Sequence, residues 1–251
     1  MDKSFPAAVA LGAAAGALAG VGLVLWQTKK PTKKPVDPSV MNRLRQSLVV
    51  PVVTVQDASQ AAAMVQALVE GGLTCVEVVF RTACAEEAVR RMVEAEPRAL
   101  VGAGTILTPQ QAERAVQAGA RFIVSPGLNP EVVHWCHAHG VVVIPGVATP
   151  TEVETAMRLG LEVLKFFPAE ANGGVAALKA IGGPYSKLTF MPTGGVNESN
   201  LEKYLSLPQV ACCGGSWMLP QDVVAQGDWR KIKSFAQEAF QLAQSIKRKG
   251  K

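Results

Sequence analysis

The chain has 251 residues, of which 49% are hydrophobic and 18% charged, and this composition excludes an intrinsically disordered protein. Its length suits one or two domains, and an α/β barrel commonly takes this many residues as a single domain. The net charge of +5 is concentrated at the ends: residues 1–37 carry +3, residues 247–251 carry +4 and residues 38–246 carry −2. The body of the protein is therefore slightly acidic, and we expect no nucleic-acid partner.

The first part of the chain contains a long uncharged segment. Residues 7–26 include no charged or strongly polar side chain, and twenty helical residues at about 1.5 Å each cross a hydrocarbon core of about 30 Å. Twelve of the twenty are Ala or Gly, which makes insertion marginal. We expect residues 1–28 to form a hydrophobic helix that anchors the protein in a lipid bilayer through residues 7–26.

Lysines flank this segment mainly on its carboxyl side, which predicts that the amino terminus lies outside and the rest of the chain in the cytoplasm. Two alternatives stay open. The segment also fits a cleaved signal peptide, or a targeting or partner-binding helix of a soluble cytoplasmic protein. The lysine cluster after the segment argues against export, and so do five cysteines that form an odd set without a Cys-X-X-Cys pair.

A short linker follows the hydrophobic segment. Residues 31–38 contain three prolines and two lysines, which cannot continue a helix and indicate an extended tether. We expect this Lys/Pro-rich tether to cover residues 29–38 and a single folded domain to occupy residues 39–251.

The rest of the chain alternates apolar runs with amphipathic segments. Near-continuous apolar runs are typical of parallel strands that are buried on both faces. Eight such runs occur, at residues 48–55, 75–80, 100–105, 122–126, 141–147, 163–167, 188–193 and 210–216. Eight strands in strict alternation with helices predict a (β/α)8 TIM barrel, with an open doubly wound sheet as the alternative.

Helix boundaries support this alternation. Thr108-Pro109 and Asn129-Pro130 each place a capping side chain before a proline that suits the first helical turn. Thr149-Pro150-Thr151 is a similar helix-start signal whose exact cap stays open. Glycines with an expected left-handed conformation end the helices, at Gly71, Gly119, Gly140 and Gly160. The last helix is expected over residues 229–246, followed by a basic tail.

Polar residues near the carboxyl ends of the predicted strands are the first candidates for function, because active sites in this fold gather there. Lys165 is the single lysine of its apolar run, where desolvation disfavours the ammonium form. A neutral amine is a nucleophile toward a carbonyl, although a lysine can also extend its charged end to solvent. Glu77 suits a proton shuttle, and it equally suits a structural ion pair with Arg81 or Lys165.

Two further features suit an anionic substrate. Arg81 offers a planar fork that matches a carboxylate. Backbone N–H groups at Gly194-Gly195 and at Gly214-Gly215, followed by Ser216, resemble the phosphate cradle that the last two loops of many TIM barrels form.

Several motifs, taken in order along the chain, resemble those of one family, the class I 2-keto-3-deoxy-6-phosphogluconate (KDPG) aldolases. This family also includes 4-hydroxy-2-oxoglutarate (KHG) aldolases. The resemblance extends over about residues 41–246. The motifs are Glu77-Val-Val-Phe-Arg81-Thr, Gly102-Ala-Gly-Thr105, Ser125-Pro-Gly, Ile144-Pro-Gly-Val, Lys165-Phe-Phe-Pro-Ala-Glu-Ala-Asn-Gly-Gly174, Pro192-Thr-Gly-Gly195 and Gly214-Gly-Ser-Trp217.

The resemblance implies a homotrimeric TIM barrel that splits KDPG into pyruvate and glyceraldehyde 3-phosphate without a metal or another cofactor. It implies Lys165 as the Schiff-base lysine and Glu77 as the general acid and base. The substrate-binding residues that it implies are Arg81 and Thr105 for the carboxylate region, Thr193 for orientation, and Gly194, Gly195 and Ser216 for the phosphate. Val79 departs from the Thr of many relatives and leaves the fine substrate preference open.

Two other functions stay open at this stage. One is cleavage of KHG, the phosphate-free substrate of the same family, to pyruvate and glyoxylate. The other is a catalytically inactive, membrane-tethered scaffold that keeps the barrel.

A histidine-rich helix also invites a metal-site interpretation. His134, His137 and His139 cluster beside Cys136, but they do not share one helix face, and we expect a solvated helix face there and no metal site.

Overall fold

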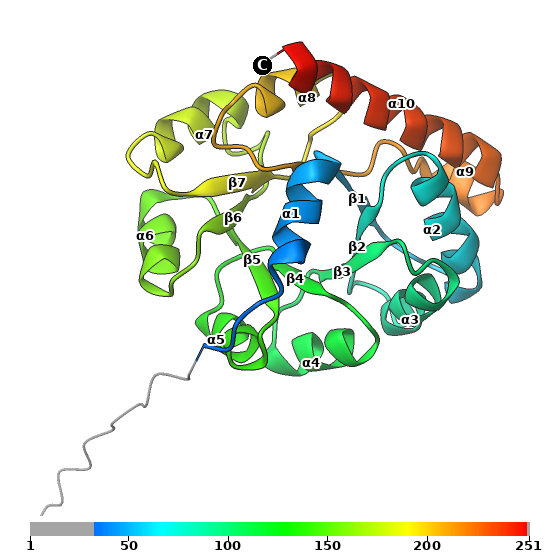
Figure 1. The fold of residues 1–251 in the computed structure, drawn as a ribbon, viewed down its shortest axis with the longest axis horizontal. Helices are drawn as coiled ribbons and strands as arrows, with labels where there is room; N and C mark the ends of the chain where they lie inside the picture. The colour runs from blue at the N-terminus through cyan, green and yellow to red at the C-terminus, as the bar shows by residue number, and fades with distance from the viewer. Residues whose placement is uncertain (1–32, 250–251) are drawn as a thin grey trace, which may run out of the picture. The chain divides into compact units, whose positions relative to one another are not determined.

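The computed structural model describes residues 33–249, in which eight parallel strands form a ring surrounded by helices (Figure 1). The strands are Val49–Val53 (β1), Cys75–Val79 (β2), Leu100–Gly104 (β3), Phe122–Ser125 (β4), Val142–Val147 (β5), Val163–Phe166 (β6), Thr189–Pro192 (β7) and Cys213–Gly215 (β8). Their order is β7-β6-β5-β4-β3-β2-β1-β8, and bridges from Phe190 to Val210 and from Thr193 to Gly214 close the ring. The predicted barrel is confirmed, and the open sheet is excluded.

Helices follow the strands in alternation and cover the outside of the ring. They are Ala61–Glu70 (α2, preceded by the short 3-10 helix Ala58–Gln60), Ala85–Ala95 (α3), Pro109–Gln117 (α4), Pro130–His139 (α5), Pro150–Arg158 (α6), Gly174–Gly182 (α7), Glu198–Leu205 (α8), Gln221–Ala225 (α9) and Trp229–Lys249 (α10). The predicted caps are confirmed at Thr108 and Asn129, whose side chains each accept a backbone N–H of the first turn. Of the two threonines around Pro150, Thr149 is the cap, and its side chain accepts the backbone N–H of Glu152.

The predicted left-handed glycines are confirmed at three of the four positions. Gly119, Gly140 and Gly160 have φ angles of 107°, 69° and 76° after α4, α5 and α6. The prediction for Gly71 is wrong, since its φ is −78° and the left-handed residue is the next one, Gly72, at 97°. One more residue therefore continues α2 in right-handed geometry before the chain reverses.

The amino end of the barrel is closed by a helix that the sequence analysis did not predict, α1 (Pro38–Ser47), which crosses the ring in Figure 1. Its buried side chains Val40 and Leu44 pack into the barrel interior with Val50, Cys75 and other inward-facing residues of the strands. Residues at i and i+4 lie on the same helix face, so both side chains face the barrel, and Val36 and Met41 pack against the same cluster.

The part of the predicted tether that the structure describes is not a free linker. The backbone N–H of Lys34 donates to the carbonyl oxygen of His137 at 2.9 Å, and Lys33 Nζ donates to that of Gly160 at 3.1 Å. Residues 33–37 therefore lie along the amino end of the barrel, and α1 begins at the last residue of the predicted tether. Residues 33–37 thus contact the barrel, and the division into a tether over residues 29–38 and a domain over residues 39–251 stays a prediction.

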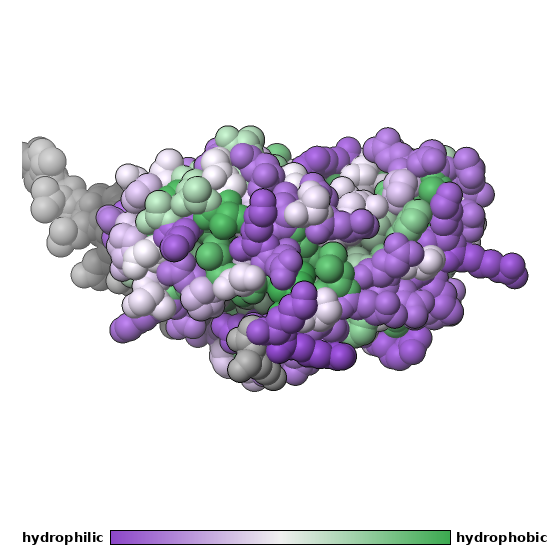
Figure 2. Space-filling model, turned by 90° about the horizontal axis from the view of Figure 1, so that it is seen from above, coloured by the Kyte–Doolittle hydropathy of each residue, from purple (hydrophilic) through white to green (hydrophobic). Residues whose placement is uncertain are grey.

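The closing helix α10 extends beyond its predicted end at residue 246 and includes the basic residues up to Lys249. Figure 2 views the side of the barrel on which α10 lies, where hydrophilic residues predominate and hydrophobic ones show between them. Within residues 33–249, no helix has both the length and the apolar character needed to cross a membrane. The predicted anchor at residues 1–28 lies outside the described residues.

Candidate active site

A lysine and a glutamate meet inside the barrel near the carboxyl ends of the strands. Lys165 belongs to β6 and Glu77 to β2, and three strands separate β6 from β2 in either direction around the ring. Both side chains point inward, because each lies two residues after an interior residue of its strand, Val163 or Cys75. Lys165 Nζ lies 3.1 Å from Glu77 Oε1, and the two residues are 5% and 0% exposed.

A glycine on the neighbouring strand makes room for the glutamate. A Cβ at Gly104 of β3 would lie 2.1 Å from Glu77 Oε1, so no other residue fits there without moving the carboxylate. The second carboxylate oxygen, Oε2, is buried and has no hydrogen-bond partner among residues 33–249. It therefore remains available to accept a proton or a hydrogen bond from a bound molecule.

Arg81 and Thr105 form the next layer toward the mouth of the barrel. Arg81 Nε donates to Thr105 Oγ1 at 3.1 Å, which joins the ends of β2 and β3. Within the described part of the chain, the guanidinium forms no salt bridge, and Glu77 pairs with Lys165 and not with Arg81. The remaining guanidinium N–H groups can therefore take an external carboxylate.

The loops after β7 and β8 lie side by side. Thr193 bridges to Gly214, and a Cβ on Gly214 would lie 2.4 Å from Thr193 Oγ1. Gly194 and Gly195 have φ angles of 96° and 84°, a left-handed pair that turns the backbone sharply after β7. The backbone N–H groups of Gly195 and Ser216 donate to no other residue in the 33–249 region. Free N–H groups in such turns are typical anion-binding elements.

A match to known proteins explains this arrangement. The family model described as "KDPG and KHG aldolase" covers residues 40–235, which contain the Lys165–Glu77 pair and both glycine loops. The chain belongs to the KDPG and KHG aldolase family. The predicted family and enzyme class are thereby confirmed.

Curated relatives of the aldolase match it over nearly their whole length. The 2-dehydro-3-deoxy-phosphogluconate aldolase of Treponema pallidum is 44% identical over 204 residues, 81% of this chain and 97% of that protein. The KHG/KDPG aldolase of Escherichia coli K12 is 46% identical over 195 residues, 78% of this chain and 92% of that protein.

Solved structures agree with this family assignment. The KDPG aldolase of Legionella pneumophila, with pyruvate captured as a covalent carbinolamine, superposes with a TM-score of 0.77 at 38% identity, over 79% of this chain and 97% of that one. The KDPG aldolase of Zymomonas mobilis ZM4, solved with 3-phosphoglycerate, has a TM-score of 0.76 at 40% identity, over 80% of this chain and 94% of that one. A carbinolamine is the adduct of an amine and a carbonyl, as expected of a class I aldolase.

One supporting contact of the aldolase site was missed by sequence reasoning. The Tyr204 hydroxyl donates to Glu170 Oε1, and Glu170 packs against Gly195, where a Cβ would lie 2.6 Å from Glu170 Cγ. Burial, together with the Glu170 carboxylate, raises the pKa of Tyr204, so the phenol stays a proton donor. Glu170 stands in the lysine-centred motif, but sequence spacing gave no sign of its partner on α8.

The histidine-rich helix α5 differs from the expected solvated face. His137 is 8% exposed and Cys136 is fully buried, whereas His134 and His139 are exposed. Desolvation, with smaller effects of Lys33 and His134, lowers the pKa of His137. In the region that the structure describes, no three His, Cys, Asp or Glu side chains are grouped to hold a metal ion.

Proposed function

We propose that this aldolase cleaves KDPG to pyruvate and glyceraldehyde 3-phosphate through a Schiff base on Lys165. The observation that carries the proposal is the buried contact of 3.1 Å between Lys165 Nζ and Glu77 Oε1 at the catalytic end of the barrel. It places a nucleophile and a proton carrier within reach of the same substrate carbon. The relatives named as KDPG aldolases support the substrate.

Imine formation begins when Lys165 transfers a proton to Glu77 and attacks the C2 ketone of the substrate. Of the three ammonium protons, Glu77 passes two to the ketone oxygen, which leaves as water, and one stays on the imine nitrogen. The product is a protonated imine, and Glu77 is again a carboxylate. The positive nitrogen then accepts the electron pair of the C3–C4 bond, so the reaction needs no metal as electron sink.

Carbon–carbon cleavage uses the same carboxylate. Glu77, through a water, takes the proton of the C4 hydroxyl while the C3–C4 electrons move into the enamine, and glyceraldehyde 3-phosphate leaves. Glu77 then protonates C3 of the enamine, and water hydrolyses the resulting imine to release pyruvate. One group thus serves as base and then as acid, which its position beside Nζ supports.

The remaining predicted residues hold the two ends of the substrate in this proposal. Arg81 and Thr105 bind the carboxylate of the pyruvyl half, since the guanidinium is uncommitted beside the Thr105 hydroxyl. The N–H groups of Gly194 and Gly195, with Ser216, bind the phosphate, and Thr193 orients the C4 region.

The direct test is pyruvate release from KDPG, measured with a lactate dehydrogenase couple. Wild-type protein should release pyruvate at an unchanged rate in excess EDTA, and the variant Lys165→Met should release none. Loss of activity in EDTA would point to a metal aldolase, and turnover by Lys165→Met would exclude the imine mechanism. No activity of the wild type on any 2-keto acid would favour the inactive scaffold.

A second candidate substrate is KHG, which lacks a phosphate. The E. coli relative is named a KHG/KDPG aldolase, so the name of a single relative includes both substrates. The free N–H groups at Gly195 and Ser216 favour the phosphorylated substrate, and the ratio of kcat/KM for KDPG and KHG measures that preference. Val79, where many relatives carry Thr, lies on the same side of β2 as Glu77 and is the first residue to vary if KHG is preferred.

We also propose that residues 7–26 anchor the enzyme in a membrane with the barrel in the cytoplasm. The length and apolar character of the segment support this, with the lysines that follow it. Cell fractionation tests it: the full chain should resist salt and carbonate and be released by detergent. Release by salt or recovery in the soluble fraction would favour the cytoplasmic alternative.

A homotrimer is the proposed assembly of the barrel, on the resemblance to the family. A related chain, 29% identical with a TM-score of 0.70, belongs to a protein cage designed by fusing symmetric oligomeric domains. Light scattering of the detergent-solubilised protein should give three chains per particle, and a monomer would contradict the proposal.

A further inference from the structure

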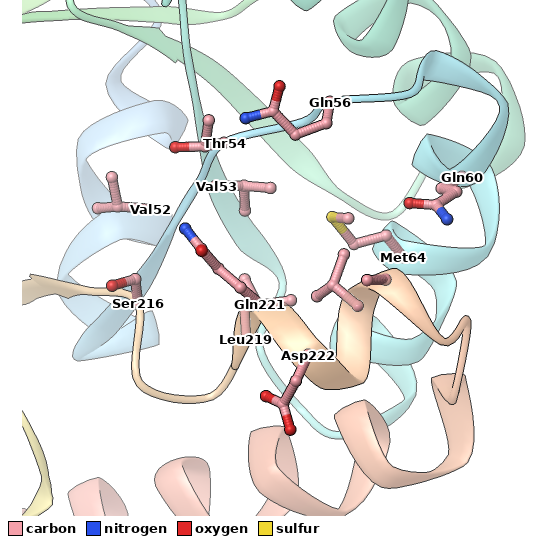
Figure 3. A pocket seen from close by; sticks show the side chains of 12 residues that line it. Val52, Val53, Thr54, Gln56, Gln60, Met64, Ser216, Leu219, Gln221 and Asp222 are labelled. Carbon is pink, nitrogen blue, oxygen red and sulfur yellow. The ribbon is translucent and has the colours of Figure 1, made fainter.

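A cavity opens beside the catalytic centre, at the same end of the barrel. It has a volume of about 490 Å³ and lies between the end of β1, the start of α2 and the connection from β8 to α9 (Figure 3). Cavities of about 300–1,000 Å³ are typical of small-molecule sites. Of the residues that line it, only Ser216 takes part in the reaction proposed above.

The inner wall of this pocket belongs to the ring of strand ends that carries the catalytic pair. Val52 is paired in register with Glu77 on the neighbouring strand, and Thr54 follows it on the same side of β1. Ser216, at the end of the proposed phosphate cradle, lines the same pocket. A molecule bound here would therefore be continuous with the substrate site.

The chemistry of the pocket differs from that of the cradle. Its polar residues are neutral except for Asp222, whose carboxylate points away from the other lining side chains in Figure 3, and no Lys or Arg lines it. No glycine lines it either, so a phosphate would lack the paired glycine N–H groups of the cradle. The amides of Gln56, Gln60 and Gln221 offer both donors and acceptors, which suit hydroxyl groups, and the buried apolar residues Met64 and Leu219 suit the carbon face of a sugar chain.

The side-chain amides of Gln56 and Gln221 are also free of hydrogen bonds to the described part of the protein. Polar side chains of other loops at this end are used to hold the loops, as when Thr82 Oγ1 donates to the carbonyl of Val55 and Asn129 Nδ2 to that of Leu107. By contrast, the side chains of Gln56 and Gln221 hydrogen-bond to no residue within 33–249, and both are exposed. In Figure 3 they extend toward the wall formed by Thr54 and Ser216.

We propose that this pocket is a second subsite of the aldolase, which binds the neutral, hydroxylated tail of aldehydes that lack a phosphate. The inference rests on the proposed aldolase function. In the synthetic direction, C3 of the Lys165-bound pyruvyl enamine bonds to the aldehyde carbon, and the aldehyde oxygen takes up a proton. Water then hydrolyses the imine, and the product is a 2-keto-4-hydroxy acid with further hydroxyls lying between Gln56 and Gln221.

The test compares two aldehydes as acceptors for pyruvate, D-erythrose and glyceraldehyde 3-phosphate, in the full-length enzyme. Gln56→Leu and Gln221→Leu keep the size of the side chain and remove its amide. Each should lower kcat/KM for D-erythrose by about 3- to 10-fold, the effect of one lost hydrogen bond, and leave that for glyceraldehyde 3-phosphate unchanged. Ala225→Phe, which projects a ring into the pocket, should act on D-erythrose in the same direction.

Gln226→Leu is the matched control, because Gln226 is exposed at the end of α9 and does not line the pocket. Equal kinetics of D-erythrose in the wild type and the Gln56→Leu/Gln221→Leu double variant would overturn the subsite while KDPG cleavage persists. A parallel loss with both aldehydes would also overturn it. A wild type that cleaves no KDPG and adds pyruvate to neither aldehyde would overturn the aldolase function itself.

Discussion

Lys165 and Glu77 start from opposite walls of the barrel, and their side chains meet with Nζ and Oε1 3.1 Å apart in an interior that is otherwise largely apolar. Each charge depends on the other there, because an isolated buried ion is costly. The pair holds a nucleophile and a proton carrier side by side, below the mouth of the barrel.

Replacing Glu77 with Gln should remove the proton carrier and keep the shape of the side chain. We expect kcat for KDPG cleavage to fall by about 10²- to 10⁴-fold, the usual contribution of general acid and base catalysis, with a smaller change in KM. Glu86→Gln on the surface of α3 is the control and should keep full activity. Near-normal turnover by Glu77→Gln would assign the proton transfers to another group.

The space beside Glu77 can be tested without touching the carboxylate. Gly104→Ala would place a Cβ 2.1 Å from Glu77 Oε1 and force the carboxylate away from Lys165. A displacement of about 1 Å costs on the order of 100-fold in rate, and steady-state kinetics should show this loss in kcat. Gly183→Ala, where the Cβ would meet nothing closer than 3.5 Å, should behave as the wild type. Equal activity of the two variants would contradict the geometry.

Arg81→Lys separates the shape of the guanidinium from its charge. The variant keeps a positive charge but loses the fork and the Nε contact with Thr105, so the KM for KDPG should rise by about 10-fold. Arg91→Lys, on the surface of α3, is the comparison and should leave KM unchanged. A KM unaffected by Arg81→Lys would place the substrate carboxylate elsewhere.

His137 should make stability depend on pH. Burial lowers its pKa in the folded state, while an unfolded chain has a histidine pKa of about 6.5. Below about pH 6.5 the unfolded chain binds a proton that the folded chain does not, so the free energy of unfolding should fall as the solution is acidified. Urea unfolding at pH 7.5 and 5.5 should show a smaller difference for His137→Gln than for the wild type. The exposed His134→Gln should keep the wild-type difference, and an identical pH dependence in all three proteins would contradict this role.

The fold was largely predictable because its signals are local. Apolar runs define the strands, and Thr or Asn before Pro defines the helix starts at Pro109 and Pro130. The helix α1 was not predicted because only Val40 and Leu44 of its ten residues are apolar core positions, and because it begins at the end of a proline-rich segment. Its role depends on the barrel that it closes, which no local pattern contains.

The site was predictable as a set of residues and not as a set of contacts. Motif resemblance predicted Lys165, Glu77, Arg81 and Thr105, but the sequence left open whether Glu77 pairs with Arg81 or Lys165. The register of a closed ring decides that question, since β2 and β6 face each other only after closure. Gln56 and Gln221 were missed because no motif marks neutral side chains that converge from distant loops.

The central claim is that Lys165 is the residue that forms the imine. Incubation of the enzyme with pyruvate and borohydride, followed by peptide mass spectrometry, tests it most directly. We expect a reduced pyruvyl adduct on the peptide that contains Lys165, its loss in Lys165→Met, and its retention in the exposed-lysine control Lys179→Met. An adduct on another lysine, or one that persists in Lys165→Met, would show that Lys165 does not form the imine.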